Sequence, residues 1–262
     1  MSEIISIANQ KGGVGKTTTA VNLAAALAEK EKRVLLLDID PQSNATTSLG
    51  FNRSDYEYNI YHVLIGSKNL SEIILKTHLE YLDIAPSNIG LVGIEKEFYD
   101  PHKKNRELVL KEKLKEVKDK YDFIIIDSPP ALGAITINAL SASDSVIIPI
   151  QCEFFALEGL AQLLNTVSLL KKTINPELKI KGFLPTMYST QNNLSKQVLE
   201  DLSHHFNNKL FHLEENSKEY ITVPRNIKIA ESPSFGKPVI EYASSSKGSI
   251  AYRDLATIIV RG

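Results

Sequence analysis

A short apolar run that ends in a glycine-rich turn constrains this chain more than any other feature. Residues 4–8 read Ile-Ile-Ser-Ile-Ala, which is typical of a buried strand, and residues 12–18 read Gly-Gly-Val-Gly-Lys-Thr-Thr. Glycines let the backbone curl so that successive N–H groups point at an anion, and the helix that follows adds its positive dipole. The sequence therefore predicts a phosphate-binding loop between a strand and a helix.

Two side chains give this loop its expected chemistry. Lys16 adds a formal charge at the phosphates, and Thr17 places a hydroxyl where a Mg²⁺ ion bridging two phosphates would lie. The general P-loop pattern begins with a glycine where this chain has Gln10, so the loop is a variant of that pattern. The residues expected to contact the nucleotide phosphates are Gly12, Gly13, Val14, Gly15, Lys16, Thr17 and Thr18.

Apolar runs alternate with helical patterns along most of the chain. Such runs are typical of parallel strands covered on both faces, and the alternation favours βαβ units. We predict an α/β fold, a doubly wound and mostly parallel sheet flanked by helices, in one P-loop domain spanning residues 1–262. The expected strands lie at 4–8, 34–37, 123–126, 146–148 and 180–184, and the expected helices at 16–30, 157–172 and 249–259.

Three aspartates follow these expected strands. Asp38 and Asp40 lie two residues apart, so strand periodicity puts them on the same side, and Asp127 ends the run at 123–126. Ligands bind at the carboxyl ends of parallel strands. We expect Asp127 to support Mg²⁺ through water, while one of the other two carboxylates orients an attacking water.

Lys11, immediately before the two glycines, changes the interpretation of the loop. The sequence Lys-Gly-Gly-Val-Gly-Lys-Thr resembles the deviant Walker A motif of the ParA/MinD/nitrogenase-iron-protein group of ATPases. That resemblance implies ATP and Mg²⁺ as cofactors. It also implies that Lys11 reaches across an ATP-bound dimer, that Lys16 and Asp40 are catalytic, and that Asp38 lies in the second shell of the metal.

Four further segments resemble the small chromosomal ParA proteins, also called Soj. The resemblance implies an ATP-bound sandwich homodimer that binds nonspecific double-stranded DNA of the nucleoid, and slow hydrolysis stimulated by a ParB-type centromere-binding partner. Pro224, Arg225 and Asn226 would approach the adenine, and Met187 would pack on the base. The segments that carry the resemblance are 8–10, 38–46, 223–226 and 233–238.

Other branches of this group fit the residues less well. Iron-protein relatives need paired cysteines, and Cys152 is the single cysteine. Residues 253–262 are too short and too poor in basic residues for the membrane helix of MinD-like proteins. A loop that begins near residue 10 leaves no room for an N-terminal helix-turn-helix domain. A MinD-like division-positioning ATPase, an ATP-dependent scaffold without DNA binding and a metabolic ligase stay open as alternatives.

DNA contacts are the least specific expectation. The formal net charge is −1, so bulk attraction to nucleic acid is absent and a local basic patch is required. The Soj pattern has an arginine where this chain has Gln191, which removes that contact or shifts it to a neighbour. The residues expected to contact DNA phosphates are Lys196, Lys228, Lys247 and Arg225.

Two further features concern location and surface. No signal peptide and no apolar stretch of membrane-spanning length is evident, so we expect a cytoplasmic, nucleoid-associated protein without membrane contact. Residues 103–120 interleave lysines with acids and place Leu110, Leu114 and Val117 at helical spacing, which predicts an amphipathic surface helix. We expect Cys152 to be a buried apolar residue.

Overall fold

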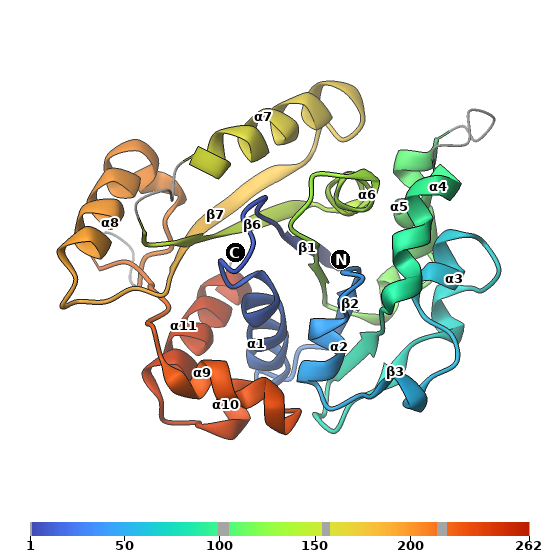
Figure 1. The fold of residues 1–262 in the computed structure, drawn as a ribbon, viewed down its shortest axis with the longest axis horizontal. Coiled ribbons are helices and arrows are strands. Elements are labelled where there is room, and N and C mark those ends of the chain that lie inside the picture. The colour runs from blue at the N-terminus through green and yellow to red at the C-terminus, as the bar shows by residue number, and fades with distance from the viewer. Residues whose placement is uncertain (1, 99–104, 154–157, 214–218, 262) are drawn as a thin grey trace.

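A seven-stranded sheet organises the molecule (Figure 1). The computed structural model describes residues 2–98, 105–153, 158–213 and 219–261. The strand order is β3-β4-β2-β5-β1-β6-β7, and every neighbouring pair is parallel except β3 with β4. The strands are β1 Glu3–Ile7, β2 Val34–Asp38, β3 Leu75–Lys76, β4 Leu82–Ala85, β5 Phe123–Asp127, β6 Ser145–Gln151 and β7 Lys179–Thr186.

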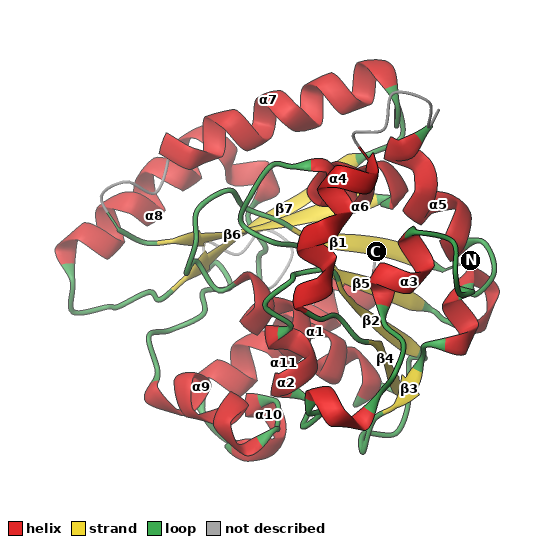
Figure 2. Ribbon diagram, turned by 45° about the vertical axis from the view of Figure 1, so that its right-hand side comes forward, coloured by secondary structure: helices red, strands yellow, loops and turns green. Residues whose placement is uncertain are grey.

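Helices cover both faces of this sheet. In Figures 1 and 2, α6 and α7 lie on one side of the sheet, whereas α1 and α11 lie on the other. The longer helices are α1 Lys16–Ala28, α6 Ala134–Ala142, α7 Glu158–Thr173, α8 Asn193–Phe206 and α11 Lys247–Arg261. The shorter ones are α2 Asn44–Ser48, α3 Ile60–Leu64, α4 Ile94–Phe98, α5 Val109–Leu114, α9 Ile227–Glu231 and α10 Val239–Tyr242.

Strand β2 shows why these sequences form central strands. Val34 and Leu36 enter the apolar cluster beneath α1, whereas Leu35 and Leu37 enter the cluster on the opposite face. All four side chains are fully buried. A strand covered on both faces needs apolar residues at every position, which is the continuous run that the sequence carries.

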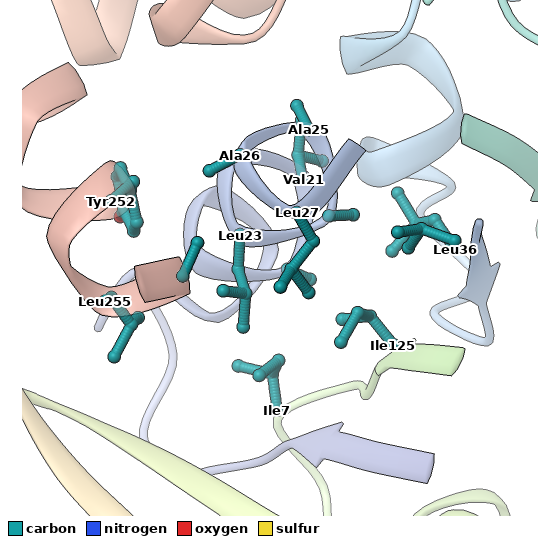
Figure 3. Close-up of a cluster of buried hydrophobic side chains, with 14 of the residues drawn as sticks. Ile7, Val21, Leu23, Ala25, Ala26, Leu27, Leu36, Ile125, Tyr252 and Leu255 are labelled. Carbon is teal, nitrogen blue, oxygen red and sulfur yellow. The ribbon is translucent and has the colours of Figure 1, made fainter. Parts of the chain in front are cut away.

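Helix α1 is enclosed on nearly all sides. Figure 3 shows Val21, Leu23 and Leu27 of α1 packed among residues from the sheet and from α11, including Ile125 and Tyr252. The helix is rich in alanine, which favours helix formation and permits close approach of its neighbours. The first turn of α1 is therefore held rigidly at the carboxyl edge of the sheet.

Two contacts join the C-terminal segment to the N-terminal half. The buried Asn22 side chain donates to the Thr18 carbonyl oxygen (2.8 Å) and accepts a hydrogen bond from the backbone N–H of Val239 (2.7 Å). The backbones of Gly50 and Gly236 also meet, since a Cβ on Gly236 would lie 2.6 Å from the Gly50 Cα atom. Residues beyond 220 thus pack against α1 and the end of α2.

The predicted α/β class and the mostly parallel sheet are confirmed. Each expected strand and long helix is present within a few residues of its predicted bounds. Strands β3 and β4 were not predicted, because two- and four-residue strands carry little periodic signal. Helix α8, which has 14 residues, was not predicted either.

The prediction of one amphipathic helix over residues 103–120 is wrong in its extent. Residues 103 and 104 lie outside the described part, and a helix covers only Val109–Leu114, flanked by the 3₁₀ turns η4 (Arg106–Leu108) and η5 (Lys118–Lys120). The chain must reverse here to enter β5 at Phe123. The apolar side chains expected to be buried, Leu110, Leu114 and Val117, are buried.

The Gly50–Gly236 contact gives a stability prediction. Gly236 has φ +64° and no room for a Cβ atom, whereas Gly66 has φ +83° with open space around that position. Both Gly→Ala substitutions carry the left-handed penalty, and Gly236→Ala adds a clash with backbone. We expect Gly236→Ala to lower the free energy of unfolding by at least about 1 kcal/mol more than Gly66→Ala, measured by urea denaturation. Equal losses would contradict the close approach.

Candidate nucleotide-binding site

The turn between β1 and α1 is anchored at both ends. The buried Asn9 side chain donates to the Pro149 carbonyl oxygen (2.7 Å) and accepts from the backbone N–H of Lys11 (3.0 Å). The Thr186 hydroxyl, at the end of β7, donates to the Val14 carbonyl oxygen (2.8 Å). The turn is thus held by β6 and β7 as well as by its own strand.

Two glycines give the turn its shape. Gly13 has φ +73° and Gly15 has φ +89°, backbone conformations that residues with a Cβ atom rarely adopt. Gly15 directly precedes α1, so the first N–H groups of that helix face the turn. The predicted strand, glycine-rich turn and helix are therefore present, and phosphate binding by this turn stays a prediction.

Lys16 lies inside the cradle and is buried. Its Nζ atom donates to the Lys11 carbonyl oxygen (2.9 Å). Burial lowers the pKa of Lys16, while the negative charges of Asp127 and Asp40 raise it. The structure thus brings together Lys16 and the two aspartates that the sequence assigned to the same site.

Asp127 is the unsatisfied carboxylate of the site. It ends β5, in register with Asp38 of β2 and Ile7 of β1, and is fully buried. Neither of its oxygens has a hydrogen-bond partner of normal geometry in the described part of the chain. Burial first, and the charge of Asp38 second, raise its pKa, and the nearby Thr17 hydroxyl lowers it. A divalent cation near Thr17 would satisfy this carboxylate, so the residues fit Mg²⁺.

Asp38 differs from its neighbour because protein groups occupy both of its oxygens. Oδ2 accepts from the Thr46 backbone N–H (2.8 Å) and hydroxyl (2.7 Å), and Oδ1 accepts from the Asp40 N–H (3.1 Å). Burial raises the pKa of Asp38 to about 6. The expected second-shell role toward a metal stays a prediction, and the contacts present organise the backbone after β2.

Asp40 lies at the mouth of the same site. It is 7% exposed, and its Oδ1 atom accepts from the backbone N–H of Gln42 (2.9 Å). Oδ2 has no hydrogen-bond partner among the described residues. Asp40 thus combines a fixed backbone with a free carboxylate oxygen close to Lys16.

A cavity of about 280 Å³ lies beside the first turn of α1. The predicted adenine-side residues Met187, Pro224, Arg225 and Asn226 all line it. Residues 223–225 reach this position by pairing with the end of β7, where the Val223 N–H donates to the Pro185 carbonyl oxygen (2.8 Å). The remaining lining residues are Gly15, Thr18, Thr186, Val223, Ile229, Ala230 and Tyr252.

Two of these predicted residues have protein partners. The Asn226 side chain accepts from the Lys228 backbone N–H (2.8 Å) and so caps α9. Arg225 forms an exposed ion pair with Glu153 (3.0 Å). Met187 has φ +52°, a strained conformation of the kind found at ligand sites.

A second cavity, of about 300 Å³, opens on the other side of the α1 N-terminus, and the sequence did not indicate it. It lies between α1, α2 and the 3₁₀ turn η7 (Ser232–Phe235). Its lining is rich in hydroxyl and amide groups: Thr17, Thr18, Val21, Asn22, Asn44, Thr47, Ser48, Ser232, Pro233, Lys237 and Pro238.

Three of the four predicted DNA contacts lie on separate helices, and the fourth, Arg225, lies in the segment before α9. Lys196 is on α8, Lys228 on α9 and Lys247 at the start of α11. Lys228 pairs with Glu231 (3.1 Å) and lies 5.6 Å from the Tyr242 ring centroid. Helix α9 and the start of α11 are neighbours, because a Cβ on Gly248 would meet the Ile229 side chain.

Comparisons with known proteins are consistent with this geometry. A family model described as an AAA domain matches residues 2–180. The sporulation initiation inhibitor protein Soj of Bacillus subtilis is 50% identical, over 98% of this chain and 97% of that protein. The chromosome partitioning protein ParA of Myxococcus xanthus is 44% identical, over 100% of this chain and 89% of that protein.

A solved structure is also similar. Cobyrinic acid a,c-diamide synthase from Mycobacterium smegmatis, with bound ATP analog and magnesium, superposes with a TM-score of 0.83 at 36% identity. The match covers 100% of this chain and 95% of that one. In the described part of this chain, no helix is long and apolar enough to cross a membrane.

The alignments with these two relatives cover nearly the whole of this chain and most of each relative. Both relatives bear the names of chromosome-partitioning or sporulation proteins of one family. The chain therefore belongs to the Soj/ParA family of chromosome-partitioning ATPases.

Proposed function

We propose that this chain is a DNA-partitioning ATPase that binds ATP and Mg²⁺, dimerises around the nucleotide and binds nonspecific DNA in that state. A ParB-type partner accelerates its slow hydrolysis, and the protein works in the cytoplasm on the nucleoid. The observation that carries the proposal is the buried cluster of Lys16, Asp40 and the unpartnered Asp127 at a glycine-rich turn that also holds Lys11.

Each residue of that cluster has a role that its surroundings support. Thr17 and Asp127 would hold Mg²⁺, which supplies positive charge at the phosphate oxygens when bound. Lys16 holds the phosphates within its own protomer. Asp40, with a free oxygen and a fixed backbone, orients water for in-line attack and accepts its proton.

Lys11 is the residue that ties hydrolysis to dimerisation. Its backbone N–H and C=O are used within the turn, and within the described residues its ammonium forms no ion pair. A lysine so placed is free to approach the nucleotide of a second copy and to stabilise the charge that develops on the transferred phosphoryl group.

DNA binding rests on exposed cations near the nucleotide cavity. Arg225 and Lys228 form exposed surface ion pairs, which contribute little to stability and which DNA phosphates can replace. Lys196 and Lys247 have no ion pair in the part of the chain that the structure describes. Contacts of this kind are to the backbone and sequence-independent, and a dimer doubles their number.

The central experiment is a shift assay on nonspecific duplex DNA with ATP, with ADP and without nucleotide, at two salt concentrations. We expect a shift only with ATP, lost in Lys16→Ala. We also expect the logarithm of the binding constant to fall by roughly 0.9 per phosphate neutralised as the logarithm of salt concentration rises. Binding that ignores both nucleotide and salt would overturn the proposal.

A small-molecule ligase is a second candidate function, because the similar solved structure bears a synthase name. That candidate predicts ATP turnover without any DNA shift, together with stimulation by an acceptor carboxylic acid. A MinD-like ATPase predicts ATP-dependent binding to anionic liposomes, and a scaffold predicts ATP-dependent dimerisation without turnover. The same protein preparation tests all three.

Removing Lys11 should uncouple nucleotide binding from hydrolysis. We expect Lys11→Ala to bind ATP but to lose dimer-dependent hydrolysis by at least about 100-fold, since a charge aimed at the transition state is missing. Phosphate release at increasing protein concentration measures this. Lys171→Ala, an exposed lysine near the end of α7, is the matched control and should behave as wild type. Normal turnover in Lys11→Ala would refute the trans role.

Removing the Asp40 charge should trap the ATP state. We expect Asp40→Ala and Asp40→Asn both to slow hydrolysis by at least about 100-fold while keeping ATP-dependent DNA binding. Asp40→Asn retains an oxygen that can accept from Gln42, so it separates loss of the charge from loss of the turn. The lifetime of the DNA complex after ATP is removed provides the measurement, and a wild-type lifetime in both variants would exclude this role.

A further inference from the structure

Thr46 lies at the centre of a buried hydrogen-bond chain next to the nucleotide site. Its side chain is 1% exposed, and it belongs to the five-residue helix α2. Its backbone N–H and its hydroxyl both donate to Oδ2 of Asp38, at 2.8 and 2.7 Å. The hydroxyl also accepts from the Ser87 backbone N–H at 3.2 Å. The Thr46 hydroxyl thus donates its one proton to Asp38.

The Asp38 carboxylate, held in this way by Thr46, also contacts the backbone of Asp40. With Oδ2 held by Thr46, Oδ1 accepts from the Asp40 backbone N–H at 3.1 Å. The Asp38 carboxylate therefore bridges the start of the loop at Asp40 and the helix that follows it. Rotation of that carboxylate would break the bonds at both ends, so Thr46 fixes the orientation on which the Asp40 backbone depends.

The backbone between the two ends of this bridge is strained. Ser43 has φ +52°, in the left-handed region that a residue other than glycine rarely occupies. Strain of this kind persists only where the surrounding structure fixes the segment on both sides. The bonds of Asp38 to Asp40 and to Thr46 are contacts that fix residues 40–46 in this way.

The chain continues outward to a half-buried side chain. Ser87, in the segment after β4, accepts at its carbonyl oxygen from the Tyr56 hydroxyl (2.7 Å). Tyr56 follows the exposed turn η1 (Arg53–Asp55). The hydrogen bonds thus connect Tyr56, Ser87, Thr46, Asp38 and Asp40 from the surface to the site.

We propose that Thr46 is a positioning residue for hydrolysis, which acts through Asp38 to hold Asp40 at the nucleotide. This inference rests on the proposed role of Asp40. The Thr46 hydroxyl is buried and engaged by Asp38 and Ser87, so we expect it to make no contact with the nucleotide. Loss of the hydroxyl should therefore slow the chemical step and leave ATP affinity intact.

The test uses the full chain in a single-turnover ATP hydrolysis assay with Mg²⁺, alongside the ATP dissociation constant and the melting temperature. Thr46→Val keeps the shape and removes the hydroxyl, and Thr46→Ser keeps the hydroxyl. Thr173→Val is the matched control, because the exposed Thr173 hydroxyl, at the end of α7, donates to the Leu169 carbonyl oxygen and makes no bond to Asp38 or to residues 40–46.

We expect Thr46→Val to lower the hydrolysis rate constant by about 10- to 100-fold, the range that a small misplacement of a catalytic group produces. The dissociation constant for ATP should change by less than about twofold. Thr46→Ser should stay within about threefold of the wild-type rate, and Thr173→Val should match wild type. A wild-type rate in Thr46→Val, or a parallel loss of ATP affinity, overturns the inference.

Two further variants keep the result interpretable. Asp40→Asn in the same assay tests the underlying function: if it hydrolyses ATP normally, the role of Asp40 fails and this inference fails with it. If Asp40→Asn is slow while Thr46→Val is normal, only the role of Thr46 fails.

Should Thr46→Val not fold, Tyr56→Phe removes the outermost hydrogen bond of the series, the one from Tyr56 to Ser87. A rate lowered several-fold at constant ATP affinity is then expected, and an unchanged rate overturns the proposal.

Discussion

The burial of two neighbouring carboxylates at the ends of β2 and β5 is the constraint on which the rest of the site depends. Asp38 and Asp127 end neighbouring strands in direct register and are both fully buried, which is costly for two carboxylates unless cations and hydrogen bonds compensate. The structure compensates them differently. Asp38 receives three hydrogen bonds from the chain, whereas Asp127 receives none in the described residues. Asp38 is therefore a structural hydrogen-bond acceptor, whereas the Asp127 carboxylate needs a cation.

The topology of the sheet explains why these groups meet. Strand β1 lies between β5 and β6. Helix α1, which follows β1, packs on one face of the sheet, and α6, which follows β5, packs on the other. A crevice forms at the carboxyl end of parallel strands where the chain diverges in this way. The glycine-rich turn after β1 and Asp127 after β5 open into that crevice. Thr186, at the end of β7, braces the turn from the far side.

Much of this site could be predicted from sequence because its chemistry is local. A run of seven residues specifies the turn, and period-two spacing specifies that Asp38 and Asp40 share a side. The partners of Asp38 could not be predicted in the same way. The contact of Thr46 with Ser87 joins residues 41 positions apart and depends on how β4 pairs with β2.

The cavity beside the first turn of α1 could likewise be predicted only in part. Met187 and residues 224–226 were predicted from the family resemblance, and they line the cavity. Tyr252 and Ile229 also line this cavity. Sequence periodicity alone does not distinguish an apolar helical residue that faces a cavity from one that faces the core. The helix expected over residues 103–120 failed for a related reason, since apolar spacing is preserved through turns as well as through helices.

The segment that carries α9 and η7 borders both cavities beside the start of α1. Asn226, Ile229 and Ala230 line the cavity of about 280 Å³, whereas Ser232 and Pro233 line the second cavity together with residues of α2. This segment ends at Gly236, whose backbone meets Gly50 just beyond α2. Close-packed backbones transmit displacement, because no side chain between them can rearrange. A displacement of η7 would therefore reach the end of α2, the helix that contains Thr46.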